Sequence, residues 1–235
     1  MAYGQPAWYP PLGLLAACIG FAICWRALID LPSVKIRFAV GMGWYAAVQI
    51  VQLSWFVSHP YGYIYALLLV LAGLWGAQWG CLTIWITPKV LERPLFLFAL
   101  AGFWTLCEWS RLFLLSGFPF NPVGLSLSGS LYSLQVAAVG GIYGLSFWVI
   151  WTNLLVLRAW MLPRLAMRWG GAVLSILLPY GVGWVHLPLH QPVTAGGESD
   201  TLSVALVQSA LPIEEKMPFQ SAEEIRQFVL EEWRS

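Results

Sequence analysis

The sequence is poor in charged side chains, and this scarcity excludes several classes of protein. Charged residues make up 10% of the 235 residues, whereas soluble globular domains average about 25%. The formal net charge is +1, and no cluster of lysine and arginine could follow a phosphate backbone, so we expect no nucleic-acid partner. A chain with so little charge is typical of a membrane protein.

Cysteine and histidine are also scarce, and neither is spaced for metal or nucleophile chemistry. The chain has four cysteines and three histidines, with no CxxC pair and no Cys/His metal spacing. The G-x-S-x-G, HExxH and P-loop motifs are absent as well. The sequence therefore indicates no metal site, no cofactor and no disulfide network. Each cysteine lies in an apolar run, where free cysteine usually packs as a small apolar residue: Cys18, Cys24, Cys81 and Cys107.

Long hydrophobic runs take the place of charge in this chain. Hydrophobic residues make up 59% of the sequence, and a membrane-spanning helix needs about 20 mostly apolar residues. The breaks between the runs carry charge or turn residues, as in SHPYG and TPKVLERP. The 15 Trp and nine Tyr suit aromatic belts at two membrane–water interfaces. We expect about six transmembrane helices, at residues 11–29, 36–57, 62–86, 95–115, 131–157 and 170–187.

The basic residues predict the orientation of these spans. They flank the first, third and fifth breaks, for example at Arg26, Lys89 and Arg158, while the second break has none and the fourth has only Arg111 at its edge. Short loops rich in Lys and Arg stay in the cytoplasm, so the odd breaks are expected there. Both termini are then expected on the extracytoplasmic side, and six spans return the chain to the side where it began.

Two glycine pairs at GxxxG spacing predict close packing between helices. Gly76 and Gly80 form one pair, and Gly140 and Gly144 form the other. Because lipid gives helices no hydrophobic drive to associate, small residues at this spacing let two backbones approach closely.

The character of the sequence changes after residue 187. The segment HQPVTAGGESD has the composition of a polar linker, and TLSVALVQ is typical of a short strand buried on both faces. Ser221 and Glu224 form a capping box in front of a helical pattern. We therefore expect a helical membrane domain at 1–187, a linker at 188–200 and the start of an α/β domain at 201–235.

The stretch EWSRLFLLSGFPFNPVG places an acid and a base inside the apolar chain. Glu108 lies seven residues before the end of its expected span, about 10 Å along a helix axis, where a charge costs up to roughly 2.5–3.5 kcal/mol. Arg111 follows at i+3 on the same helix face, so we expect the two side chains to pair. Two interpretations stay open: an ion pair that stabilises the bundle, or a polar cavity that contacts a lipid headgroup.

The loop after this pair is expected to be stiff. Pro119 and Pro122 fix their own φ angles and restrict the residues before them. Gly117 and Gly124 allow turns that a side chain would forbid. Two phenylalanines would lie at interface depth, so the loop suits the rim of a site through which lipid enters.

Four stretches resemble one family. FWTLCEWSRLFLLSGFPFNPVGLSLS resembles the signature of bacterial apolipoprotein N-acyltransferases, in which a helix with an acid and an arginine leads into a G-F-P-W/F loop. GIYGLSFWVIWTNLLVL resembles the family's next helix, and LSWFVSHPYGYIY an earlier stretch with Trp55 before a short external loop. TLSVALVQSALPIEEK resembles the first strand and loop of the family's nitrilase-like domain, so the resemblance runs over most of the chain in the right order.

This resemblance implies a fold, a reaction and a set of residues. The fold would be an α-helical membrane bundle of about six transmembrane helices, followed by the first strand and helix of an incomplete α/β nitrilase-like domain. The enzyme would lie in the bacterial inner membrane and transfer an acyl chain from a phospholipid to the N-terminal S-diacylglyceryl-cysteine of a lipoprotein, as the last step of lipoprotein maturation. The lipid-cavity candidates are Trp55, Glu108, Arg111, Gly117, Phe118, Pro119, Phe120 and Asn121.

The chain departs from the family pattern at its end. It stops at Ser235, inside the first helix of the nitrilase-like part, before the family's catalytic acid, lysine and cysteine. We therefore expect no catalytic residue in it, no activity of the chain alone, and a remainder that is encoded separately, lost or left out. The alternative is a small membrane transporter, or a scaffold with an extracytoplasmic tail, although the sequence shows no internal repeat.

Overall fold

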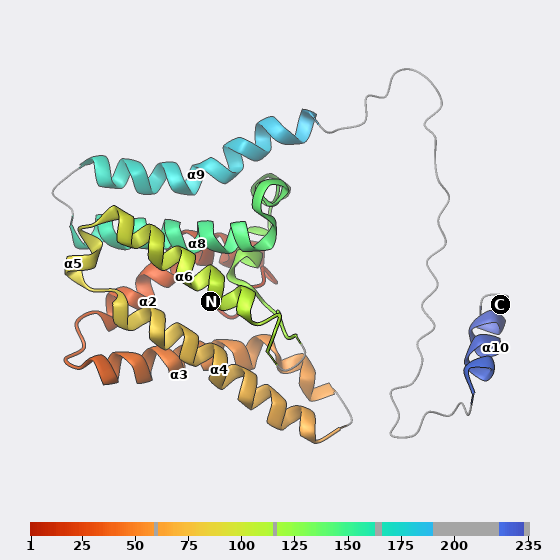
Figure 1. Cartoon of the computed structure of the whole chain (residues 1–235). Coiled ribbons are helices and arrows are strands. Elements are labelled where there is room, and N and C mark those ends of the chain that lie inside the picture. Colours follow the sequence, from red (N-terminus) through yellow and green to blue (C-terminus); the bar gives the residue numbers. More distant parts are fainter. Residues whose placement is uncertain (59–60, 115–116, 163–165, 190–220, 233–235) are drawn as a thin grey trace, which may run out of the picture. The chain divides into compact units, whose positions relative to one another are not determined.

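The computed structural model describes residues 1–58, 61–114, 117–162, 166–189 and 221–232 (Figure 1). They belong to two compact units. The first unit comprises Met1–Ser54 and Leu68–Gln191, and the second comprises Trp55–Leu67 and Pro192–Ser235. Throughout the described ranges the regular secondary structure is helical, which confirms the helical class. The expected strand and linker lie outside these ranges, so they and the domain boundaries stay predictions.

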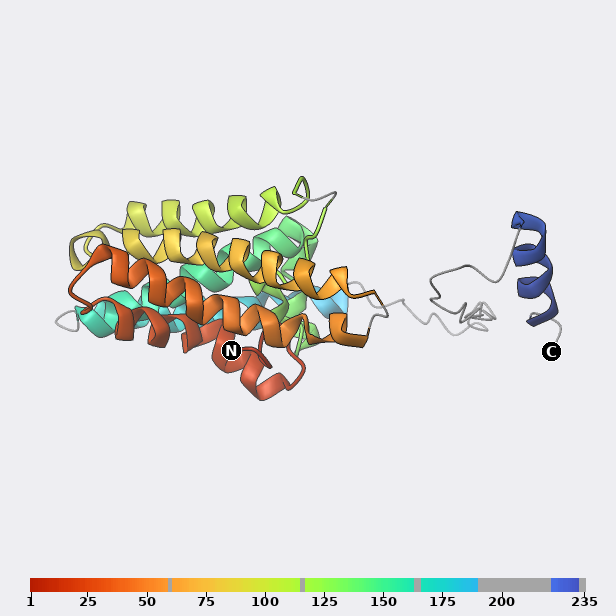
Figure 2. The same cartoon turned by 90° about the horizontal axis from the view of Figure 1, so that it is seen from below.

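Helices of very different lengths follow one another along the chain. The α-helices are α1 (Pro10–Leu15), α2 (Phe21–Leu28), α3 (Val34–Gln52), α4 (Tyr63–Trp85), α5 (Pro88–Leu91), α6 (Pro94–Ser110), α7 (Leu131–Leu134), α8 (Ala137–Met161), α9 (Ala166–Leu189) and α10 (Ala222–Glu232). A π-helical turn, η1 (Ala16–Gly20), joins α1 to α2, and two 3₁₀ turns are η2 (Ser54–Ser58) and η3 (Val123–Leu127). In the first unit, α8 packs against α2, α6 and α9 (Figures 1 and 2).

Each of the six apolar runs contains helix, but the number of spans is confirmed only in part. Four helical stretches are long and apolar enough to cross a membrane: Pro10–Leu28, Tyr63–Trp85, Ala137–Met161 and Ala166–Leu189. These make the chain a membrane protein. The helix α6 is apolar but shorter, because it ends at Ser110 and not at residue 115, and the first turn of α3 contains Lys35 and Arg37. The count of six therefore stays a prediction.

Tryptophan also fills the core of the bundle, a role that the sequence analysis missed when it assigned this residue type to the interfaces. Trp79 stacks on Trp25 at 5.1 Å and on Tyr45 at 4.9 Å between ring centroids. Trp104 meets Trp79 edge-on at 5.1 Å. All four side chains are at most 1% exposed. One aromatic cluster therefore joins α2, α3, α4 and α6.

The two GxxxG pairs have different environments. A Cβ atom on Gly76 would lie 2.6 Å from the carbonyl oxygen of Met42, and one on Gly80 would lie 2.9 Å from the ring of Phe38. This pair therefore brings α4 against α3, as predicted. For Gly140 and Gly144 the prediction is wrong, because no other element of the described residues comes within 4 Å of either Cβ position. Between them Gly141 has φ +58°, which breaks the helix and removes the shared face.

Asn153 of α8 holds the interrupted first helix. Its Oδ1 accepts hydrogen bonds from the backbone amides of Phe21 and Ala22, both at 3.0 Å. Its Nδ2 donates to the carbonyl oxygens of Ala17 at 2.7 Å and Ala16 at 3.3 Å, and to its own helix. A π-helical turn displaces the ordinary backbone hydrogen bonds, and unsatisfied backbone groups are costly in a membrane. One side chain therefore satisfies the break and fastens it to α8.

The second unit contains the Trp55 segment and α10. In the Trp55 segment, the Ser58 hydroxyl donates to the carbonyl oxygen of Trp55 at 2.7 Å, and the Tyr65 hydroxyl donates to the carbonyl oxygen of Val57 at 3.1 Å. At the start of α10, the Ser221 hydroxyl accepts a hydrogen bond from the backbone amide of Glu224 at 3.2 Å. The predicted helix and its serine cap are therefore confirmed.

Replacing Asn153 by leucine should destabilise the bundle strongly. The variant loses all five side-chain hydrogen bonds, and each buried backbone group left unpaired costs about 1–3 kcal/mol. Unfolding in mixed detergent micelles, followed by circular dichroism, measures the loss. Thr152→Val is the matched control, because the buried hydroxyl of Thr152 has no hydrogen-bond partner among the described residues. Equal stability of the two variants would contradict the role of Asn153.

A methyl group at Gly76 should separate α3 from α4. Gly76→Ala forces a Cβ against the Met42 carbonyl, and overpacking of this kind costs about 1–3 kcal/mol. Gly73→Ala, one turn away in the same helix, meets open space and should be neutral or slightly stabilising. The same unfolding measurement compares the two, and a Gly76 variant as stable as the Gly73 variant would show that this contact does not limit packing.

Candidate functional site

Glu108 fastens the loop that follows α6 to the helix itself. Its side chain lies in the last turn of α6 and is 1% exposed. The Oε1 atom accepts a hydrogen bond from Trp104 Nε1 at 2.8 Å, one helical turn back. It also accepts one from the backbone amide of Val123 at 2.8 Å, where η3 begins. Glu108 therefore connects α6 to a loop residue that lies 15 positions further along the chain.

The expected ion pair between Glu108 and Arg111 is not formed in the described part of the chain. Arg111 Nε instead donates to Gln78 Oε1 of α4 at 2.9 Å. The i+3 spacing brings two side chains together on a continuing helix, but α6 ends at Ser110 and Arg111 is its C-terminal cap. The guanidinium therefore reaches α4, while the carboxylate turns toward the loop.

The Arg111 guanidinium lies between two tryptophan rings. Its Cζ atom is 4.9 Å from the centroid of the Trp75 ring and 5.2 Å from that of Trp104. Arg111 is 1% exposed, so these contacts are shielded from water. Cation–π contacts are strongest when desolvated, and they help to explain how a buried arginine is tolerated without a carboxylate partner.

Hydrogen bonds fix the loop from Gly117 to Gly124 at several backbone positions. Besides the contact of Val123 with Glu108, the Phe118 amide donates to the Arg111 carbonyl oxygen at 3.0 Å. The Asn121 carbonyl oxygen accepts from Gln5 Nε2 at 3.0 Å, and the Gly124 amide donates to Ser146 Oγ of α8 at 3.0 Å.

The backbone of this loop also requires special conformations. Gly117 has φ +97° and Asn121 has φ +51°, in the left-handed region that glycine and asparagine tolerate best. A Cβ on Gly124 would lie 2.7 Å from backbone atoms of α8, so only glycine fits there. These residue types explain why this sequence forms a tight loop at this place.

Gln5 is a residue of the site that sequence reasoning missed. It is completely buried, and its Nε2 donates to the Tyr45 hydroxyl at 3.1 Å as well as to Asn121. A glutamine near the start of a chain carries no periodic or motif signal, so only the folded structure brings it to the loop.

Several buried polar atoms around the loop have no hydrogen-bond partner among the described residues. In the loop and α6 these are Asn121 Nδ2, Glu108 Oε2 and both terminal nitrogens of Arg111. In α3 they are both amide atoms of Gln49 and of Gln52. Buried polar groups are nearly always paired, so this group has free capacity for waters or a polar ligand.

The register of α3 against α4 indicates where Gln49 lies. Gly41 faces Thr83, and Gly76 faces Met42 and Ala46, so the two helices run antiparallel. One turn after Ala46, Gln49 is expected level with Ala72 and Gly73, which lie about one turn of α4 from Trp75, whose ring contacts the Arg111 guanidinium. The unpaired amide and the unpaired guanidinium are therefore expected in neighbouring layers of the bundle.

The structure brings only some of the remaining lipid-cavity candidates together. Phe118 and Phe120 form a ring pair at 5.7 Å, and Phe118, Pro119 and Phe120 are half-buried or exposed beside the polar group. Trp55 is 53% exposed and belongs to the second unit, so its place beside the loop stays a prediction.

The described residues contain no group of three or more His, Cys, Asp and Glu that could hold a metal ion. The four cysteines lie within η1, α2, α4 and α6 and are half-buried. This arrangement can bind and orient a polar group inside an apolar bundle, and we identify no nucleophile in it.

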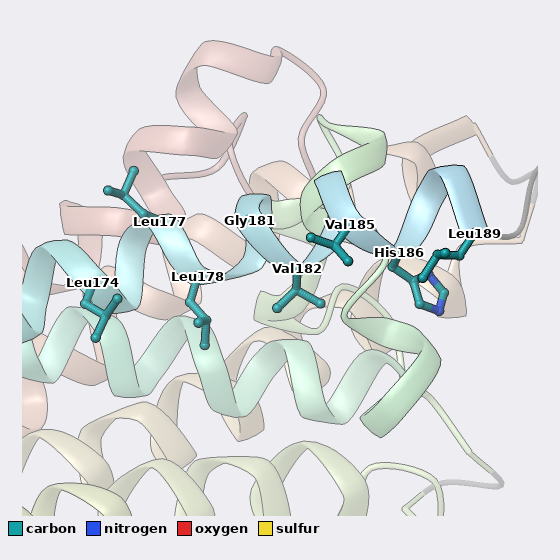
Figure 3. Close-up of a pocket in the computed structure, with 8 residues that line it drawn as sticks. All are labelled: Leu174, Leu177, Leu178, Gly181, Val182, Val185, His186 and Leu189. Atoms are coloured by element: carbon teal, nitrogen blue, oxygen red, sulfur yellow. The ribbon is translucent and has the colours of Figure 1, made fainter.

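A groove of about 610 Å³ follows one face of α9 (Figure 3). Its lining is apolar except for His186, whose Nδ1 is 3.0 Å from Gln135 Oε1. Its lining contains no carboxylate, lysine or arginine, so it suits an apolar chain and not a reaction. The residues that line it are Leu174, Leu177, Leu178, Gly181, Val182, Val185, His186 and Leu189.

Comparisons with known proteins agree on one family. The family model described as the apolipoprotein N-acyltransferase N-terminal domain matches residues 4–155. The apolipoprotein N-acyltransferase of Chlamydia pneumoniae is 29% identical over 90% of this chain and 40% of its own length. That of Nitrosomonas europaea is 31% identical over 74% of this chain and 35% of its own length. The chain thus spans 35–40% of the length of these relatives, and no solved structure matches it significantly.

Replacing Glu108 by leucine should release the loop, whereas glutamine should hold it. Glu108→Gln keeps a side-chain oxygen for the Val123 amide, but Glu108→Leu leaves that amide unpaired, at about 1–3 kcal/mol. Hydrogen exchange of the peptide covering Val123, measured by mass spectrometry, should therefore be at least about five-fold faster in the leucine variant. Equal exchange in the two variants would show that the carboxylate does not anchor the loop.

Proposed function

The chain belongs to the apolipoprotein N-acyltransferase family, and from this membership we propose that it is the membrane part of such an enzyme. The complete enzyme would transfer an acyl chain from a phospholipid to the N-terminal S-diacylglyceryl-cysteine of a lipoprotein. The match over residues 4–155 carries this proposal. The transporter or scaffold alternative has no comparable support.

The role of this part is to receive the phospholipid. An apolar acyl chain suits the surfaces between membrane helices, and the polar part of the lipid needs partners that the bundle must supply. The unpaired nitrogens of Arg111 are such partners, because a guanidinium fork matches the oxygens of a phosphate. The Phe118–Phe120 pair and Pro119 would form the rim of the same cavity, and Trp55 is a separate candidate for contact with lipid.

Glu108 and Gly117 have a positioning role in this proposal. They set the path of the loop, one through its contact with Val123 and the other through its left-handed backbone. Asn121 contributes a free amide nitrogen on the same loop. Glu108 therefore acts on the lipid through the loop and not by direct contact.

We place the acyl-transfer chemistry outside this stretch. Each of its cysteines is part of a helix, and none lies in a His, Cys, Asp and Glu group among the described residues. The nucleophile, acid and lysine of the family would come from a nitrilase-like domain, whether continuous with residues 201–235 or encoded separately, and the chain alone would be inactive. The distribution of basic residues supports a bacterial inner-membrane location with both termini extracytoplasmic.

Arg111→Gln should weaken use of the phospholipid in a complete enzyme that carries residues 1–187 of this chain. Loss of a hydrogen bond to a charged group costs about 1.5–3 kcal/mol, so the KM for phospholipid should rise by about ten-fold to a hundred-fold. Lipoprotein N-acylation in isolated membranes, measured against phospholipid concentration, gives this value. The Arg111→Lys variant should restore the original KM for phospholipid only in part.

The matched control for this experiment is Arg26→Gln. Arg26 is partly exposed and pairs with Asp30 at the end of α2, so this variant loses one arginine without changing the cavity. Normal acylation by the Arg111 variant, at a normal protein level, would reject the proposed contact. A kcat loss with unchanged KM would reassign Arg111 to a purely structural role.

A further inference from the structure

A second groove lies at the other end of α6 from Glu108. It has a volume of about 410 Å³, within the range of about 300–1,000 Å³ that is usual for ligand sites. It is formed where the end of α4, the short α5 and the first half of α6 meet. Its lining is apolar and aromatic: Trp85, Val90, Phe96, Ala99, Leu100 and Phe103.

Most of this lining is one stripe of α6. Phe96, Ala99, Leu100 and Phe103 recur at i, i+3, i+4 and i+7, which places them on one helix face. From Phe96 to Phe103 the stripe is about 10 Å long, and it runs along the helix axis. An elongated apolar surface that follows a membrane helix has the shape of a site for an acyl chain.

The end of this stripe near α5 is basic. The Arg93 guanidinium lies over the ring of Phe96, with Cζ 5.6 Å from its centroid, and Lys89 precedes the lining residue Val90. Both cations are exposed, and neither takes part in an ion pair within the described ranges. The only acid in the turn is Glu92, which is also exposed.

Two further arginines add to the positive charge of this turn. Arg37 Nη1 donates to the Ile86 carbonyl oxygen at 3.3 Å, and Arg158 Nε donates to the Leu91 carbonyl oxygen at 2.9 Å. These bonds use backbone oxygens, so the positive charges are not neutralised. Four cations against one carboxylate surround residues 86–93, which leaves a clear excess of positive charge at the end of the apolar groove.

We propose that this groove binds one anionic phospholipid, with its headgroup at Lys89 and Arg93 and an acyl chain along the α6 stripe. Two features select this occupant. The apolar stripe requires an acyl chain or another apolar group, and the positive charge favours a headgroup with a net negative charge over a zwitterionic one. The bound lipid would clamp α4 to α6, at the opposite end of α6 from the proposed substrate cavity.

This site is independent of the proposed acyl transfer. It uses none of the residues assigned to the phospholipid substrate, and it would be present whether or not the chain supports lipoprotein maturation. It also differs from ordinary lipid contact around a membrane protein, because general contact discriminates little between headgroups and would not depend on two particular cations.

Binding is tested with the full 235-residue chain, purified in a neutral detergent. Phosphatidylglycerol and phosphatidylcholine with identical acyl chains are added separately, and retained lipid is counted by native mass spectrometry. One phosphatidylglycerol should be retained at least about ten-fold more tightly than phosphatidylcholine, since each juxtamembrane cation is worth about five-fold. Equal retention of the two lipids would overturn the proposal.

Three variants locate the site. Lys89→Gln with Arg93→Gln should abolish the preference for phosphatidylglycerol, and both side chains are exposed, so the fold should persist by circular dichroism. Arg26→Gln with Lys35→Gln is the matched control, because it removes two positive charges elsewhere and should keep the preference. Phe96→Ala should weaken retention of both lipids. Loss of the preference in the control pair, or its survival in the Lys89 and Arg93 pair, would refute the assignment.

Discussion

The hydrogen bond from the Val123 amide to the Glu108 carboxylate is the contact on which the arrangement of the polar site depends. The helix α6 ends at Ser110, and the loop after it is hydrogen-bonded to α6 and to α8 inside the bundle. Inside an apolar bundle, a backbone amide without a partner costs free energy, so an irregular loop requires an acceptor. Glu108 is that acceptor, and the contact explains why an acid occurs in an apolar helix.

Asn153 solves the same physical problem two turns further along α8 from Ser146. The π-helical turn interrupts the first long helix, and one amide side chain satisfies both its donors and its acceptors. In both places a buried polar side chain pairs with the backbone groups at the interruption, so the break in regular structure costs less free energy inside the apolar bundle. In the proposed function, these interruptions bring polar groups into the bundle that can meet the polar part of a lipid.

The aromatic core connects the Glu108 contact to the buried guanidinium of Arg111. Trp104 donates to Glu108, packs against the Trp79 stack and lies under the Arg111 guanidinium. A buried arginine is thus held by ring faces and one amide oxygen, which leaves its terminal nitrogens unpaired. At the other end of α6 the cations are exposed beside an apolar groove. One helix therefore carries two surfaces suited to lipid, one buried and polar and the other open and basic.

By itself the sequence determined the membrane class, the helical runs, the family, the serine cap of α10 and the tight loop, because each follows from composition or from residues near one another in the chain. Only the tertiary structure decided the partners of buried polar groups. Glu108 and Arg111 are three residues apart yet contact different elements, and Gln5 reaches a loop 116 residues away. Of two glycine pairs with the same spacing, only one meets a neighbouring helix within the described part of the chain. Such partners depend on where helices end and on their mutual register, which local spacing does not encode.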